Sequence, residues 1–126
     1  MSQSPKAKLA RVIFRPGQRL FKEGDIGQEA YIVEDGIVEV EVRRATDHVV
    51  VNTIERGGIV GEMALFDDLP RSASARAVSE TVVLVVPREL LHERLAAADP
   101  VLQRVVLTLV DRLRTQTRVN AAGRQR

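Results

Sequence analysis

The chain has 126 residues, of which 44% are hydrophobic, 29% are charged and none is cysteine. One globular domain is expected from this length and composition, whereas disorder, disulfides and thiol catalysis are excluded. Aromatic residues make up only 3%, which argues against a platform that stacks nucleic-acid bases. The N-terminus lacks the apolar stretch of a signal peptide, and apolar runs such as Val82–Val86 are far shorter than the roughly 20 residues of a membrane helix. A cytoplasmic protein with no membrane span is therefore expected.

The net charge of +2 conceals three blocks of charge. Residues 1–22 carry six basic and no acidic groups, residues 23–41 carry seven acidic and no basic groups, and residues 100–126 carry six basic groups against one acidic group. We interpret these blocks as solvated surfaces and expect no direct nucleic-acid binding. An acidic partner could still contact the basic C-terminal block.

Residues 12–87 show the pattern of a β domain, because Gly and Pro recur every few residues and apolar side chains alternate between them. The first clear strand is Gly36–Arg43. Its three valines are expected in the core, and its alternate charged residues Glu39, Glu41 and Arg43 in solvent. The polar stretch Arg43–His48 predicts a hairpin tip, followed by a strand at Val49–Ile54.

After Pro87 the apolar spacing becomes helical. One helix is expected at Arg88–Ala98, and a second begins with Asp99 as N-cap and Pro100 at its first position and reaches about Arg118. The apolar stripe of the second helix is wide. Either the whole helix lies against the β domain, or one face with heptad-like spacing contacts a second copy; that face holds Leu102, Val106, Leu109 and Leu113.

The strand pattern breaks without a simple turn between Val60 and Ala77. A short helical signature at Glu62–Phe66 follows Gly61, which allows a ligand to approach the unpaired N–H groups of a helix start. The guanidinium of Arg71 matches phosphate oxygens. The carboxylate of Glu62 beside such an anion is expected to accept hydrogen bonds from neutral hydroxyls. Together they predict a sugar phosphate ligand.

Two motifs resemble the cyclic nucleotide-binding domains of catabolite activator proteins, cyclic-nucleotide-dependent kinases and cyclic-nucleotide-gated channels. The first is similar to the phosphate-binding cassette of that family and lies in residues 60–77; it reads Gly61-Glu62-Met63-Ala64-Leu65, a five-residue spacer, then Arg71-Ser72-Ala73. The second reads Glu23-Gly24-Asp25-x-Gly27-x-x-x-Tyr31-x-Val33-x-x-Gly36. The resemblance covers roughly Phe14 to Arg118 and departs from the family slightly at Phe21 and Ala30.

The resemblance implies a mainly β fold, a jelly-roll-like β-roll of eight strands followed by two C-terminal helices, in a single domain over residues 1–126. It implies that Arg71 pairs with the cyclic phosphate of cAMP or cGMP and that Glu62 accepts the ribose 2′-hydroxyl. The remaining ligand-binding residues would line the phosphate; they are Gly61, Met63, Ala64, Ser72 and Ala73. Ser74 and Arg76 are expected to face outward from the strand that follows.

The choice between adenine and guanine stays open, because a hydroxyl at Ser72 is compatible with both. The base is expected against apolar positions of the β-roll, for which Val40, Val42, Val51 and Ile59 are candidates. Many relatives cap the base with a residue of the last helix. Arg112 and Arg114 fall near that place.

The sequence argues against two classes of enzyme. His48 and His92 are 44 residues apart with no His-x-His pair, so a metal-dependent β-roll enzyme is not expected, and there is no Gly-x-Ser-x-Gly elbow of a hydrolase. The sequence predicts a non-enzymatic, stand-alone sensor without a cofactor beyond its ligand, which signals through a homodimer or an effector protein. The alternatives are a related module that has lost its ligand and binds proteins, and a fragment of a channel or transcription regulator.

Overall fold

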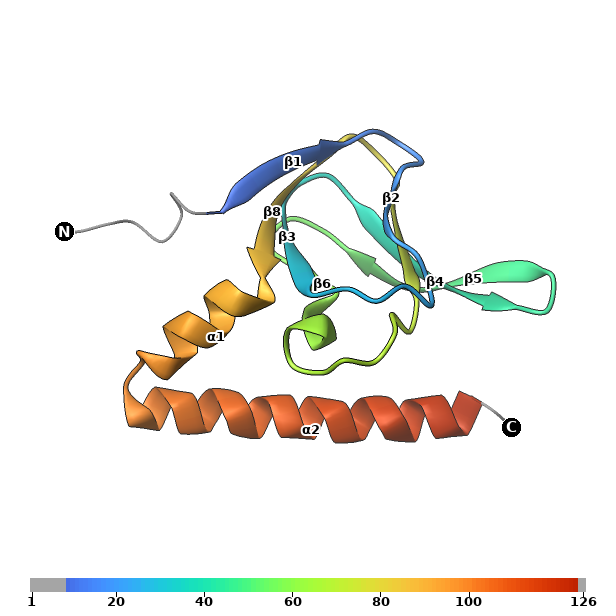
Figure 1. Ribbon diagram of the computed structural model, residues 1–126. Helices are drawn as coiled ribbons and strands as arrows, with labels where there is room; N and C mark the ends of the chain where they lie inside the picture. The colour runs from blue at the N-terminus through green and yellow to red at the C-terminus, as the bar shows by residue number, and fades with distance from the viewer. Residues whose placement is uncertain (1–8, 125–126) are drawn as a thin grey trace. The chain divides into compact units, whose positions relative to one another are not determined.

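The computed structural model describes the backbone of residues 9–124 and the side chains of residues 9–115 (Figure 1). The chain forms two compact units, one up to Arg88 and one from Glu89 onwards. The first contains the strands and the second contains most of the helical residues.

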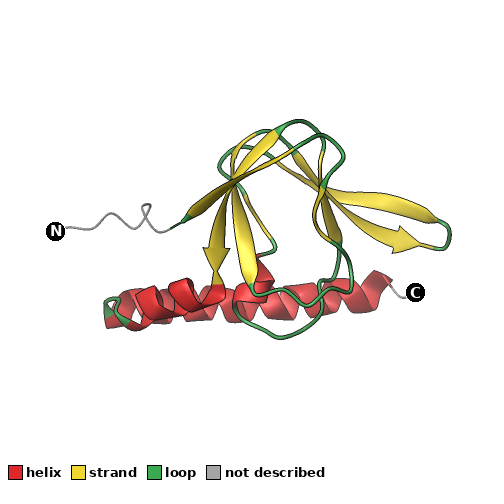
Figure 2. Cartoon of the chain, turned by 45° about the horizontal axis from the view of Figure 1, so that its top comes forward, coloured by secondary structure: helices red, strands yellow, loops and turns green. Residues whose placement is uncertain are grey.

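Among the described residues, the first unit contains eight strands in two antiparallel sheets (Figure 2). One sheet has the order β1-β8-β3-β6 and the other β2-β7-β4-β5. The strands are β1 (Ala10–Phe14), β2 (Arg19–Phe21), β3 (Glu29–Asp35), β4 (Val38–Arg44), β5 (Asp47–Ile54), β6 (Ile59–Val60), β7 (Ser74–Ala77) and β8 (Thr81–Pro87). The predicted fold class, mainly β with eight strands and two following helices, is confirmed.

The core of the roll consists of small and branched aliphatic side chains, as the low aromatic content requires. Val33, Val38 and Val83 are fully buried. On β7, Ala75 and Ala77 point into the same core, and Ala73 just before the strand is also buried. These alanines allow the two sheets to approach closely at β7, which places the end of the cassette beside the core.

One charged residue of β4 is not where the sequence predicted it. Glu41 was expected in solvent but is only 6% exposed. The register shift between β4 and β5 places its extra residue on β5, because Val40 pairs with Asn52 and Glu41 with Val50. Glu41 therefore stays on the same face as Glu39, and its burial comes from the side chains that surround it there. Side chains from three other strands surround the Glu41 carboxylate: the His48 imidazole of β5 lies at 3.4 Å, the Arg76 guanidinium of β7 at 3.9 Å and the Arg19 guanidinium of β2 at 4.0 Å.

The hairpin between β4 and β5 is tighter than predicted. β4 continues to Arg44 and β5 begins at Asp47, and Ala45 takes a left-handed conformation with φ 51° at the tip. His48 was expected in the loop but is the second residue of β5. The polar residues that were predicted to form the loop of the hairpin therefore lie partly in the ends of its two strands.

Ser74 was expected to face outward into solvent, but a loop covers it on that face. Ser74 is buried, and its hydroxyl oxygen accepts a hydrogen bond of 2.8 Å from the backbone N–H of Glu23. The loop that follows β2 covers it. Arg76, two residues later on the same face, is partly exposed and donates a 2.9 Å hydrogen bond to Glu39, as an outward-facing residue can.

The helices are α1 (Arg88–Ala96) and α2 (Pro100–Arg124). α1 ends two residues before the predicted Ala98, and α2 extends beyond the predicted Arg118. The predicted cap is confirmed, because Asp99 Oδ1 accepts a 2.8 Å hydrogen bond from the N–H of Val101. Of the heptad-like set, Leu102, Leu109 and Leu113 are exposed and Val106 is partly buried. Within the described residues, no helix has the length and apolar character that crossing a membrane demands.

Candidate functional site

The cassette, residues 60–77, contains a short 3-10 helix, η2 (Glu62–Leu65), between β6 and β7. It is one residue shorter than the predicted Glu62–Phe66, because the backbone of Phe66 is no longer helical, with φ −128°. Gly61 precedes η2 with φ 78°, a conformation that favours glycine. Ala64 and Leu65 are buried and anchor the turn in the roll.

Backbone hydrogen bonds attach the far end of the cassette to the loop between β2 and β3. The N–H of Arg71 donates to the carbonyl of Asp25 at 2.7 Å, and the carbonyl of Arg71 accepts from the N–H of Gly24 at 2.8 Å. These bonds bring the two sequence motifs together, since Gly24 and Asp25 belong to the second motif.

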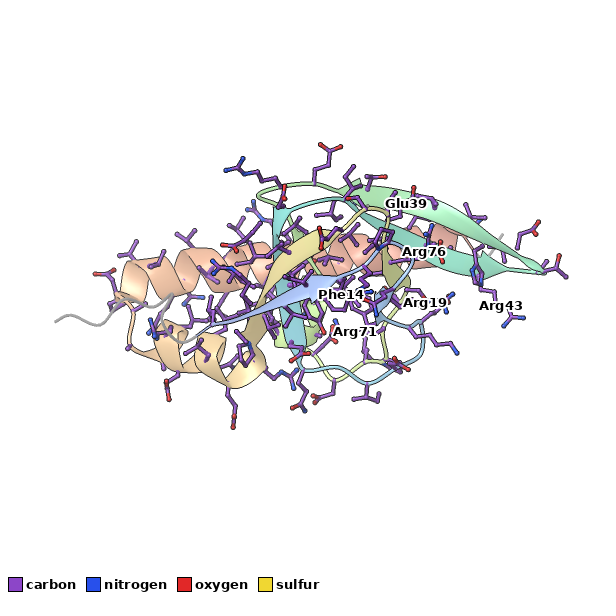
Figure 3. The ribbon with its side chains drawn as sticks, turned by 90° about the horizontal axis from the view of Figure 1, so that it is seen from above. Phe14, Arg19, Glu39, Arg43, Arg71 and Arg76 are labelled. Carbon is purple, nitrogen blue, oxygen red and sulfur yellow. The ribbon has the colours of Figure 1, made fainter. Side chains whose placement is uncertain are left out.

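The guanidinium of Arg71 bridges two segments of the roll. It donates from Nη2 to the carbonyl of Glu29 at 2.8 Å and from Nη1 to the carbonyl of Gly61 at 3.2 Å. Its Cζ lies 4.0 Å from the centre of the Phe21 ring. Arg71 is only 8% exposed, so this cation is held inside the protein rather than in solvent (Figure 3).

Two glycines make room for this side chain. A Cβ at Gly27 would lie 2.3 Å from Arg71 Nη2, and a Cβ at Gly61 would lie 2.6 Å from Arg71 Nη1. Any larger residue at either position would displace the guanidinium. The slot for Arg71 is therefore built from glycines of both sequence motifs.

Arg71 is incompletely satisfied by the protein. Its Nε is buried and has no hydrogen-bond partner among the described residues. Burial lowers the pKa of its guanidinium, and the nearby Tyr31, Glu29 and Asp25 offset part of that effect. A buried cation with a spare donor is stabilised by an anion that accepts hydrogen bonds, and a phosphate oxygen is well suited to a guanidinium.

Aromatic side chains support the slot. The Phe21 ring stacks on Tyr31 with 6.0 Å between centroids, and Phe14 meets Tyr31 edge-on at 6.5 Å. The Tyr31 hydroxyl donates to the Glu29 carboxylate at 2.8 Å, and burial raises the pKa of Tyr31. Three of the four aromatic residues of the chain thus lie in one cluster, and the Arg71 guanidinium packs against the Phe21 ring of that cluster.

The other predicted ligand-binding residues occupy the same cassette. Gly61, Glu62 and Met63 are half-buried, Ala64 and Ala73 are buried, and Ser72 is exposed. The Glu62 carboxylate forms no hydrogen bond or ion pair with the residues that the structure describes, so it is available to a ligand hydroxyl. Of this set, Gly61 accepts a side-chain hydrogen bond from Arg71.

The predicted base contacts are less uniform. Val42 is buried and Val40 packs against the core cluster, whereas Val51 and Ile59 are each more than a third exposed. Arg112 and Arg114 lie on α2, where Arg114 is 3.7 Å from Asp111. The base position and its cap stay predictions.

Sequence reasoning missed Arg88. Its guanidinium donates to the carbonyl of Asp67 at 2.5 Å, to the carboxylate of Asp68 at 2.6 Å and to the carbonyl of Leu65 at 3.4 Å. The sequence did contain one signal. Arg88 is a cation at the start of a predicted helix, where the helix dipole disfavours positive charge, and this suggests that another segment provides hydrogen-bond acceptors for it.

Comparison with known proteins agrees with this geometry. A family model described as "Cyclic nucleotide-binding domain" matches residues 11–98. The chain belongs to this family. The domain is 33% identical over 103 residues to a cAMP-dependent protein kinase regulatory subunit of Emericella nidulans, which covers 79% of the domain's chain and 24% of the relative. It is 36% identical over 94 residues to a cGMP-dependent protein kinase of Eimeria tenella; the match covers 75% of this chain and 9% of the kinase.

Two solved structures of other proteins are also similar to this chain. The half-site-occupied form of the EAL enzyme Bd1971 has a TM-score of 0.78 at 35% identity, covering 86% of the chain described above and 98% of the solved chain. The catabolite activator protein of Thermus thermophilus has a TM-score of 0.75 at 29% identity, covering 90% and 54%. The domain spans about a quarter or less of the length of the two kinase-related relatives.

Proposed function

We propose that this domain binds cAMP or cGMP through the cassette and reports binding to a partner. The buried guanidinium of Arg71 carries the proposal, because it is desolvated and retains an unpaired Nε donor. A singly charged cyclic phosphate would neutralise the guanidinium and accept from that donor. Related proteins support this ligand class, since they are named for cAMP or cGMP and one solved form of the EAL enzyme is the cAMP-bound form.

The remainder of the ligand would contact the rest of the cassette. Glu62 would accept the ribose 2′-hydroxyl, since its carboxylate is half-buried and without an internal partner. Gly61, Met63 and Ala64, together with Ser72 and Ala73, would line the phosphate with backbone or hydroxyl donors.

We further infer that the domain acts as a sensor rather than as an enzyme. Binding would change the conformation of the cassette and, through it, that of the helices. The exposed leucines of α2 would then contact a second copy or an effector protein. The cytoplasmic location expected from the sequence stays a prediction, which cell fractionation would test.

Isothermal titration of the purified, nucleotide-stripped protein tests the binding step. We expect saturable binding of cAMP or cGMP with micromolar or tighter affinity, and none of the noncyclic 5′-monophosphates, which serve as controls. The ratio of the two affinities would identify the preferred base. A folded, ligand-free protein that binds none of the four would instead favour a module that works by protein interaction alone.

A further inference from the structure

Arg71 and Arg88 connect the same two parts of the roll. Arg71 donates to carbonyls of Glu29 and Gly61, at the start of β3 and the start of the cassette turn. Arg88 also reaches both parts. Its backbone N–H donates to the carbonyl of Gln28 at 2.8 Å, while its side chain donates to carbonyls of Leu65 and Asp67 at the end of the turn.

The contacts of Arg88 replace hydrogen bonds that the turn lacks. η2 is only four residues long, and the last carbonyls of a helical turn have no partner within it. The N–H groups of Phe66 and Asp67 both donate to the carbonyl of Met63, at 3.0 and 3.1 Å. The carbonyls of Leu65 and Asp67 accept from Arg88 instead. A turn this short is not stable alone, so its geometry depends on such outside contacts.

The carboxylate of Asp68 contributes in a different way. It accepts from Arg88 Nη1, but its side chain is 86% exposed. Exposed ion pairs contribute little, so the two carbonyl bonds, which are partly buried, carry most of the restraint.

We propose that Arg88 is a positioning residue for cyclic-nucleotide binding. It holds the end of the cassette turn at a set distance from residues 28 and 29, so that Gly61 and Glu29 form the two sides of the Arg71 slot. Because Arg88 is also the first residue of α1, a displacement of the turn on ligand binding is transmitted directly to the first turn of that helix. This inference rests on the function proposed above.

The test uses Arg88→Gln, with Arg94→Gln on the exposed side of the same helix as the matched control. Hydrogen exchange of the ligand-free proteins is measured first. We expect the amides of Phe66 and Asp67 to exchange about tenfold faster in Arg88→Gln, with the β3 and β8 core amides unchanged. Arg94→Gln should match the wild type throughout. This arm does not depend on nucleotide binding, so it tests the positioning role even if the proposed ligand is wrong.

The second arm measures binding of cAMP and cGMP. Arg88→Gln should weaken the better-bound nucleotide about tenfold or more, whereas Asp68→Asn should stay within about threefold because both carbonyl bonds remain. Arg88→Lys should restore part of the affinity. If Arg88→Gln keeps wild-type affinity and wild-type exchange at the turn, the inference is overturned. If Arg88→Gln unfolds, a wild-type exchange pattern in Arg88→Lys together with undiminished affinity would overturn it equally.

Discussion

The guanidinium carbon of Arg71 lies 4.0 Å from the centre of the Phe21 ring, so the buried cation rests on an aromatic face. A cation–π contact in a desolvated site contributes about 2 kcal/mol or more. The ring fixes the plane of the guanidinium, and two backbone carbonyls fix its rotation. The unpaired Nε is thereby held in one orientation before any ligand arrives.

Arg71→Ala is expected to weaken cyclic-nucleotide binding on the order of 100-fold or more, because the buried phosphate would lose its countercharge. Arg71→Lys keeps the charge but cannot bond both carbonyls in one plane, so its affinity should fall between those of Arg71→Ala and the wild type. Titration calorimetry provides the measurement. Arg11→Ala, on an exposed and salt-bridged arginine of β1, is the control and should bind normally. An unchanged affinity in Arg71→Ala would mean that another residue holds the phosphate.

Glu62→Ala should have a smaller effect, about 1–3 kcal/mol in binding free energy, because it removes a hydrogen bond to a neutral hydroxyl. The same substitution should abolish discrimination between the ribose ligand and its 2′-deoxy analogue. Both affinities can be obtained in parallel titrations. If Glu62→Ala still discriminated between the two ligands, the carboxylate would not contact the 2′-hydroxyl.

Gly27→Ala should impair binding while leaving the fold intact. The new Cβ would lie 2.3 Å from the end of the Arg71 side chain, which is flexible enough to move aside without disturbing backbone. We expect about a tenfold loss of affinity, the scale of one misplaced charged hydrogen bond, and little change in Tm. Gly17→Ala is the contrasting control: its φ of 89° makes alanine strained, yet nothing surrounds the new Cβ. Gly17→Ala should therefore lower Tm and keep the affinity, and the opposite pattern would contradict the assignment of the slot.

Gly36→Ala should destabilise the roll strongly. Gly36 has φ 102°, and a Cβ there would lie 2.7 Å from the Cα of Thr81 and 2.6 Å from the carbonyl oxygen of Glu80. Backbone atoms cannot move aside cheaply, so we expect a loss of at least about 1–3 kcal/mol in unfolding free energy. Gly57→Ala has a similar φ of 89° but open surroundings, so in urea denaturation the difference between the two variants isolates the steric part. Equal losses would show that strain in φ alone accounts for both.

Tyr31 predicts a stability change at alkaline pH. Burial raises its pKa in the folded state above the ordinary value of 10.0. In the unfolded state the phenol ionises near that ordinary value, so unfolding releases a proton at higher pH. Stability from this group is therefore complete below pH 10 and declines above it, by about 1.4 kcal/mol per pH unit. Urea denaturation between pH 9 and 11 should show a steeper decline for the wild type than for Tyr31→Phe; parallel curves would contradict this account.

Much of the roll and of its site could be predicted from local pattern. Glycine punctuation and alternating valines indicated the strands. The sequence also brought Gly61 and Arg71 together in one cassette, and the anion site predicted there stays a prediction. The failures have a common physical cause, which is contact with segments distant in the chain. Glu41 is buried because side chains of three other strands surround it, two of them arginines, and Ser74 is buried because the loop at Glu23 covers it. Arg88 was missed since two of its partners are backbone carbonyls, which any residue type provides.

The position of Tyr31 gives this protein a built-in optical reporter. It is the single tyrosine of a chain without tryptophan, so ultraviolet emission excited near the tyrosine band comes from this one ring. The ring stacks on Phe21, and its hydroxyl donates to Glu29, whose carbonyl accepts from Arg71. Any rearrangement of the Arg71 slot thus alters the surroundings of this tyrosine, and the unlabelled protein can report such a rearrangement through its own emission.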